Sequence, residues 1–328
     1  MAQRADVLVV GAGVTGLTTA VCLAEQGLAV HIQAIDPPRR TTSAVAAAVL
    51  GGPAIADPAE APNWAPYETT LRWHRTSLEE FGALAERPET GVRITPGRWA
   101  SKAEIQDTTW TRSLPGYRDC SPEERAGFPV AFWMSLPIVD MHRYLDHLTG
   151  RFTAAGGTMT TGRVGSLREA AAEAPVVVNA TGAYAHHFAA DPKVVPVRGQ
   201  HVIVENPGLE TYFFEFSRGA ATTHFMPHGD RLILGGNAGR GDWSLEPDPA
   251  QTEQIIARCA AVEPRIADAR VLGVEVGLRA ARPEIRLEEE VVEGARVIHN
   301  YGHSGVAVGM SWGCAREVEQ LVLRTVRT

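Results

Sequence analysis

The sequence has few lysines, no closely spaced pair of cysteines, and no long apolar stretch without glycine. Only two of its 31 basic residues are lysines, and 38 acidic residues give a net charge of −7, so nucleic-acid binding has no electrostatic support. Four cysteines without a CxxC pair or a Cys/His cluster argue against a metal site. They favour reduced thiols in a cytoplasmic protein.

The longest uncharged stretch, residues 7–24, is long enough to suggest a signal peptide or a membrane span. Gly11, Gly13 and Gly16 interrupt it, Asp6 precedes it, and no stop-transfer pattern follows. A buried strand that leads into a helix explains the stretch better, so we expect no membrane association. The 328 residues, 45% of them hydrophobic, are enough for about two domains with a sizeable core.

The first fifty residues predict a βαβ unit. Residues 6–10 (DVLVV) read as a strand whose apolar run after Asp6 is continuous, as in a parallel strand covered on both faces, and a helix is predicted from Val14. A second strand is predicted over residues 30–35, and Asp36 follows it directly.

The turn between this strand and this helix has the spacing Gly11-x-Gly13-x-x-Gly16. The first glycine makes the tight turn, the second lets the backbone approach a pyrophosphate, and the third lets the helix pack on the strand. Asp36 lies 20 residues after Gly16, where a carboxylate can bind ribose hydroxyls. NAD and FAD share this unit, so the motif predicts a dinucleotide site without choosing between them.

Later segments indicate that two domains alternate along the chain. The segment Val176 to Gly182 resembles the strand-to-ATG segment of flavoproteins, where the chain returns to the dinucleotide. Strands dominate the part that follows. A strand and a helix of the nucleotide-binding type return at the end of the chain. The predicted elements are a helix over 137–155, a strand over 175–179, strands within 198–236, a helix from Asp248-Pro249, a strand over 297–301 and a helix over 312–324.

Five further segments together resemble the D-amino acid oxidase family, and the match extends nearly from end to end. The last three, in this order after a glycine-rich start, are highly specific. The segments are 41–48 (TTSAVAAA), 197–200 (VRGQ), 277–283 (GLRAARP), 297–305 (VIHNYGHSG) and 312–315 (WGCA).

The resemblance implies non-covalent FAD, a D-amino acid substrate and oxygen as electron acceptor, with a 2-oxo acid, ammonia and hydrogen peroxide as products. It implies a mixed α/β fold in which a Rossmann-like FAD-binding domain is interleaved with a β-rich substrate-binding domain. The FAD-binding domain would comprise 1–60, 136–195 and 296–328, and the substrate-binding domain 61–135 and 196–295. We expect neither a nucleic-acid nor a membrane partner, and a homodimer is the assembly to test.

The resemblance also assigns an FAD site. It includes the glycine turn, the acidic residue after the second strand, a pyrophosphate-facing segment, one adenine contact and the backbone around the isoalloxazine ring. These residues are Gly11, Gly13, Val14, Thr15, Gly16, Asp36, Thr42, Ser43, Ala46, Ala47, Val164, Gly182, Ser304, Gly305, Val306, Ala307, Val308 and Gly309.

Arg279 matches the family's carboxylate anchor. A guanidinium grips a carboxylate through two parallel hydrogen bonds and stays charged at any working pH. Gly305 would supply a backbone carbonyl to the substrate amine. Hydride transfer demands orientation more than acid–base chemistry, so no catalytic carboxylate is expected. Arg282 and Arg286 are interpreted as structural.

The sequence departs from the family at the active-site lid, where animal members have two tyrosines. His224 replaces the carboxylate-bonding tyrosine if the alignment follows Pro227, whereas Phe225 replaces it if the alignment follows the aromatic residue. Only His224 could donate a hydrogen bond, and a surface role for it is an equal alternative. Leu50 and Gly52 match two further substrate-facing positions.

Glu215 matches the arginine with which D-aspartate oxidases accept acidic side chains. A carboxylate there would disfavour acidic substrates and favour neutral or basic ones. Alternatively, Glu215 faces solvent or pairs with Arg218. Two other functions are kept open: a glycine- or sarcosine-type amine oxidase, and a non-catalytic FAD-binding protein.

Overall fold

The computed structural model describes residues 5–51, 67–103, 112, 114–215 and 221–324. A continuous sheet joins two regions of different construction. The strands are β1 (Val7–Val10), β2 (Val30–Ala34), β3 (Val92–Ser101), β4 (Arg118–Asp119), β5 (Val130–Val139), β6 (Thr158–Thr161), β7 (Val176–Asn179), β8 (Val195–Glu205), β9 (Tyr212–Glu215), β10 (Ala221–His228), β11 (Arg231–Asn237), β12 (Gly239–Arg240), β13 (Val271–Val292) and β14 (Ala295–His303).

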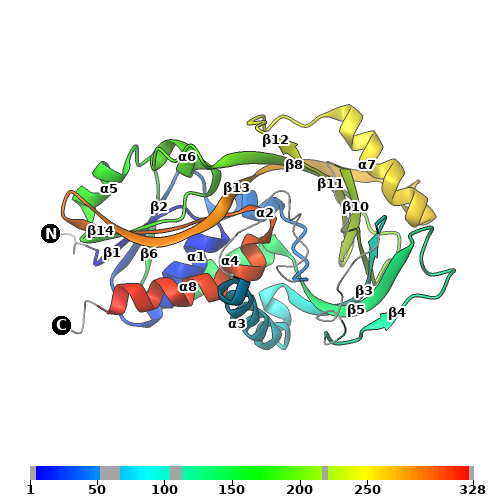
Figure 1. Ribbon diagram of the computed structural model, residues 1–328, viewed down its shortest axis with the longest axis horizontal. Coiled ribbons are helices and arrows are strands. Elements are labelled where there is room, and N and C mark those ends of the chain that lie inside the picture. Colours follow the sequence, from blue (N-terminus) through cyan, green and yellow to red (C-terminus); the bar gives the residue numbers. More distant parts are fainter. Residues whose placement is uncertain (1–4, 52–66, 104–111, 113, 216–220, 325–328) are drawn as a thin grey trace.

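The parallel region contains the strand order β14-β7-β1-β2-β6, in which all neighbours run parallel. The antiparallel region contains the order β4-β5-β3-β9-β10-β11-β8-β13, in which only β3 and β9 run parallel. Strand β13 pairs with both β8 and β14 and runs from one region to the other (Figure 1). The helices are α1 (Val14–Glu25), α2 (Thr42–Val45), α3 (Tyr67–Ala85), α4 (Met141–Ala154), α5 (Leu167–Glu173), α6 (Ala185–Phe188), α7 (Pro249–Val262) and α8 (Ala307–Leu323).

Helices cover both faces of the parallel region, which explains why β1 is apolar at every position. Val7 and Val9 join a core built with α1, α4 and α8, whereas Leu8 and Val10 join a second core with α5. This arrangement confirms the βαβ unit and the buried strand predicted near residue 176. The mixed α/β fold class is also confirmed.

In the antiparallel region, alternate residues face different surroundings. Phe213 and Phe225 point toward α7, where Ile255 and Cys259 complete a core. Tyr212 and Met226 occupy the opposite face, which we call the inner face, in a cluster that includes Ala47 from the segment after α2. The inner face is therefore the one that looks toward the parallel region's connecting segments.

Two predicted helix boundaries were wrong. Pro137 to Val139 belong to β5, and α4 begins only after Asp140, whose carboxylate accepts a hydrogen bond from the Arg143 amide. The last helix begins at Ala307 rather than Trp312. Within α8, a Cβ on Gly313 would lie 2.2 Å from the Trp73 carbonyl oxygen, so this glycine permits close packing of α8 on α3.

Helix α3 packs mainly on α8 and also touches β3 and β5 of the antiparallel region. Its buried Phe81 and Leu84 belong to the same core as α1 and α4, although the sequence-based division placed residues 61–135 in the substrate-binding domain. The helix start at Asp248-Pro249 is confirmed, with the Asp248 carboxylate as N-cap. Within the described ranges, no helix is long and apolar enough to cross a membrane.

Candidate active site

The glycine turn after β1 packs directly against the end of β7. Gly11 adopts φ +113°, and a Cβ on it would lie 2.4 Å from the Ala180 carbonyl oxygen. A Cβ on Gly16 would lie 2.0 Å from the Gly11 carbonyl oxygen. Only glycine fits at these two positions. The close packing places the amino-terminal end of α1, which is the positive end of the helix dipole, beside the Ala180–Thr181 backbone.

Helix α2 connects this turn to the antiparallel region. The Ser43 hydroxyl accepts a hydrogen bond from the Val14 amide at 2.9 Å, and the Thr42 hydroxyl accepts one from the Leu278 amide at 3.2 Å. Leu278 directly precedes Arg279, so two adjacent side chains fix the glycine turn and the predicted anchor strand relative to each other.

The remaining predicted cofactor residues lie around the carboxyl ends of the parallel strands and the start of α8. Asp36 follows β2 and is half-exposed, with Arg40 Nε 3.9 Å from its Oδ1. Residues 304–306 form a short 3-10 turn that leads into α8, and a Cβ on Gly309 would lie 3.7 Å from the buried Leu50. Val164 is buried in the core shared with β1 and α5, and Gly182 has φ +58°.

Arg279 lies on the inner face of β13. Its guanidinium covers Gly199 of β8, where a Cβ would be 2.5 Å from Nη1, and Nη1 donates to the Asn237 carbonyl oxygen at 3.1 Å. A Cβ on Gly305 would lie 3.8 Å from Arg279 Cδ. The structure therefore brings the predicted anchor and the predicted amine acceptor together.

Two histidines lie beside Arg279. His201 of β8 and His224 of β10 are both buried, and their Nε2 atoms are 3.1 Å apart. The Nδ1 atom of His201 lies 2.7 Å from the Val45 carbonyl oxygen. Burial, followed by the charge of Arg279, lowers the pKa of His201 to about 4. Burial also lowers the pKa of His224 well below its ordinary value, so both rings are neutral near pH 7.

The hydrogen-bond partners determine the tautomers of this pair. A backbone carbonyl can only accept, so Nδ1 of His201 carries the hydrogen and its Nε2 must accept. His224 therefore donates from Nε2 to His201. Its own Nδ1 has no hydrogen-bond partner among the residues that the structure describes. In this neutral state, neither ring offers an N–H to a carboxylate.

The strand register separates His224 from Phe225. His224 stacks on Phe214 with the rings 5.6 Å apart, on the inner face. Adjacent residues of a strand point to opposite faces, so Phe225 points away from Arg279 into the core under α7. Of the two alternatives for the missing tyrosine, the structure brings only His224 to the anchor.

Glu215 also points away from the inner face, because it follows Phe214 in β9. It is buried, accepts a hydrogen bond from the Thr223 amide at 2.9 Å and lies 2.7 Å from Lys102 Nζ. The structure thus does not bring Glu215 to Arg279, and the solvent-facing alternative is wrong. Gly52 and Arg218, which the sequence analysis also named, lie outside the described residues.

The two arginines near the anchor have structural partners, as predicted. Arg282 Nε donates to Asp191 Oδ2 at 2.9 Å, and Arg286 Nη1 donates to the Tyr301 hydroxyl at 2.9 Å. Tyr301 in turn donates to Asp191 at 2.9 Å.

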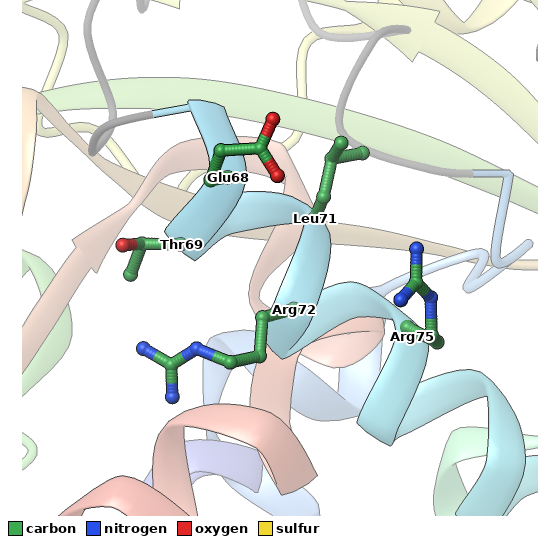
Figure 2. A pocket seen from close by; sticks show the side chains of 5 residues that line it. All are labelled: Glu68, Thr69, Leu71, Arg72 and Arg75. Carbon is green, nitrogen blue, oxygen red and sulfur yellow. The ribbon is translucent and has the colours of Figure 1, made fainter.

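Two cavities accompany these elements. One of about 320 Å³ lies along the first turns of α3 and is lined by Glu68, Thr69, Leu71, Arg72 and Arg75 (Figure 2). Within the described part of the chain, no predicted site residue lines it. The other, of about 240 Å³, includes Asn237, whose carbonyl binds Arg279, and Arg258 of α7. The second cavity thus borders Asn237, the partner of Arg279, from the α7 side.

Sequence reasoning missed four residues that surround the anchor: Gly199, His201, Phe214 and Asn237. Gly199 lies within the recognised VRGQ segment and His201 directly follows that segment. In the strands predicted within 198–236, residues two apart share a face, so this pattern could have placed both side by side. Phe214 and Asn237 had no such signal, because only the pairing of β9, β10 and β11 brings them to the site.

Comparisons with known proteins agree with this geometry. The family described as FAD dependent oxidoreductase matches residues 6–321. A D-amino-acid oxidase from Rubrobacter xylanophilus is 42% identical over 325 residues, covering 97% of this chain and 95% of the relative. A D-amino-acid oxidase from Streptomyces coelicolor is 45% identical over 325 residues, covering 96% of each.

A solved structure of glycine oxidase from Geobacillus kaustophilus shares the fold. It superimposes with a TM-score of 0.79 at 21% identity and covers 98% of this chain and 95% of its own. At this identity the likeness establishes the architecture alone. The match over residues 6–321 and the two full-length relatives show that the chain belongs to the FAD-dependent oxidoreductase family that includes the D-amino-acid oxidases.

Proposed function

We propose that the protein is an FAD-dependent oxidase that converts neutral D-amino acids to 2-oxo acids, ammonia and hydrogen peroxide. The observation that carries this proposal is the position of Arg279, whose guanidinium lies over Gly199 and whose stem adjoins Gly305. Two relatives named D-amino-acid oxidase, at 42% and 45% identity, support the reaction class.

The residues at the end of the parallel region fit FAD. Gly11 and Gly16 leave no room for side chains where a pyrophosphate would approach α1, and Asp36 stands at the end of β2 for the ribose. We propose that the cofactor is held without a covalent link. When bound, FAD supplies a two-electron acceptor that oxygen can reoxidise. Acid precipitation should then leave the yellow colour in the supernatant, and colour in the pellet would contradict it.

The protein's part in the reaction is to orient the substrate. Arg279 holds the carboxylate, and the Gly305 carbonyl accepts a hydrogen bond from the amine, so the α-carbon is fixed between them. The amine must be neutral for hydride loss, and the resulting imine hydrolyses in water. We propose that His201 and His224 form an uncharged surface beside Arg279 and that the substrate carboxylate binds Arg279 and neither histidine.

The inner face also limits which side chains are accepted. Phe214 stacks on His224, and Trp99 lies against Phe214 with the rings 4.6 Å apart. This wall is aromatic and uncharged, which favours neutral apolar side chains over charged ones. A preference for basic side chains would require Glu215 in the pocket, and Glu215 faces away from it toward Lys102.

A peroxide assay of the yellow protein separates the proposal from its two alternatives. We expect peroxide with D-methionine but not with L-methionine, glycine or sarcosine. Preference for glycine or sarcosine would indicate a glycine- or sarcosine-type amine oxidase instead. Bound FAD without peroxide from any of these substrates would indicate a non-catalytic protein.

We propose a cytoplasmic location and a homodimer. The four cysteines are buried free thiols, which supports a reducing compartment such as the cytoplasm. A homodimer stays a prediction, and light scattering coupled to size-exclusion chromatography would test it.

A further inference from the structure

A buried chain of polar side chains leads from β13 to the turn beside the glycine motif. Asn179 ends β7, directly before the Ala180–Thr181 backbone on which Gly11 packs. His299 of β14 lies opposite Asn179 in the strand register, with its Nδ1 atom 3.1 Å from Asn179 Nδ2. On its other side, His299 Nε2 is 2.9 Å from Glu290 Oε1.

The directions of these hydrogen bonds follow from one backbone donor. The Thr181 amide can only donate, and it lies 3.2 Å from Asn179 Oδ1, which also accepts the Thr181 hydroxyl at 2.8 Å. Asn179 must therefore present its NH2 group to His299, so Nδ1 of His299 accepts. The remaining nitrogen, Nε2, carries the hydrogen and donates to Glu290.

We propose that His299 is a positioning residue for the cofactor, acting through Asn179 and Thr181. This inference rests on the FAD site proposed above. Asn179 and His299 are fully buried, so an amide without its partner would reorient and release Thr181. The turn that meets Gly11 would then lose its shape. Glu290 is the outer end of the chain, because its side chain remains 39% exposed.

The test is FAD affinity of the apoprotein, measured by quenching of flavin fluorescence, together with the melting temperature without and with FAD. We expect His299→Leu to weaken FAD binding at least ten-fold and to reduce the FAD-induced rise in melting temperature. His299→Gln can accept from Asn179 and donate to Glu290, so it should restore most of the affinity. Thr181→Val, which removes one bond at the far end of the chain, should weaken binding about three-fold.

Glu289→Gln is the matched control. Glu289 directly precedes Glu290 on the same strand, but its carboxylate binds Arg296 and not His299, so FAD affinity should be unchanged. If His299→Leu does not fold, His299→Gln and Thr181→Val carry the test. Equal FAD affinity in the wild type and in all folded His299 and Thr181 variants overturns the positioning role. A wild-type apoprotein that binds no FAD would instead overturn the cofactor site itself.

Discussion

The parallel and antiparallel regions build their sites in different ways. At the end of the parallel region, glycines and backbone groups form the site: Gly11 packs on the Ala180 carbonyl and Gly16 on the Gly11 carbonyl. On the inner face of the antiparallel region, side chains from separate strands form it, with Arg279 from β13 beside His201 and His224. The glycine turn of the first site leaves a local signal in the sequence, whereas the second site exists only once the strands are paired.

The largest effect is expected where backbone packing leaves no space. Gly16→Ala would place a methyl group 2.0 Å from the Gly11 carbonyl oxygen. We expect loss of FAD binding and a fall in stability of about 1–3 kcal/mol, measured by flavin content and by urea unfolding of the apoprotein.

Gly150→Ala is the control, because Gly150 lies in α4 and a Cβ on it meets no atom of the described residues within 4 Å. It should keep FAD and gain about 0.5–1 kcal/mol from helix propensity. Full FAD content in Gly16→Ala would show that the turn tolerates a side chain and that the parallel-region site is misread.

The second effect tests the inner face by changing neighbouring residues of one strand. His224→Leu should raise KM for D-methionine about ten-fold, or ~1.4 kcal/mol. The substitution removes the hydrogen bond that His224 donates to His201 and the imidazole ring that packs beside Arg279. The value of kcat should change less. Steady-state kinetics measure both.

Phe225→Leu is the paired variant on the opposite face. It should leave KM unchanged and lower stability by about 1–3 kcal/mol, since Phe225 belongs to the core under α7. The reverse result, with KM sensitive to Phe225 and not to His224, would mean that the register of β10 is shifted by one residue.

The sequence predicted the parallel region well for a physical reason. A strand covered on both faces, a glycine turn and an acidic residue after β2 leave local signals, and the resemblance added Arg279 and Gly305. The antiparallel region leaves fewer local signals in its sequence. Neither the burial of Glu215 nor the partner of His224 can be predicted without the register in which β9 and β10 pair. The start of the last helix at Ala307 was also missed, because the sequence analysis began this helix at Trp312.

The smallest effect concerns Glu215. Because its carboxylate lies 2.7 Å from Lys102 Nζ on the face away from Arg279, Glu215→Gln should leave the ratio of kcat/KM for D-methionine over D-aspartate unchanged within about two-fold. A large gain for D-aspartate would return Glu215 to the pocket and contradict the assigned face of β9.

The most direct test of the whole account compares Arg279→Ala with the wild type on D-methionine and on D-methioninamide, which lacks the carboxylate. Breaking a buried ion pair costs about 3–5 kcal/mol, so kcat/KM for D-methionine should fall at least a hundred-fold. For the amide, the two proteins should differ little, and flavin content should be equal. Near-native oxidation of D-methionine by Arg279→Ala, or an equal loss on both substrates, would contradict the claim that Arg279 anchors the carboxylate.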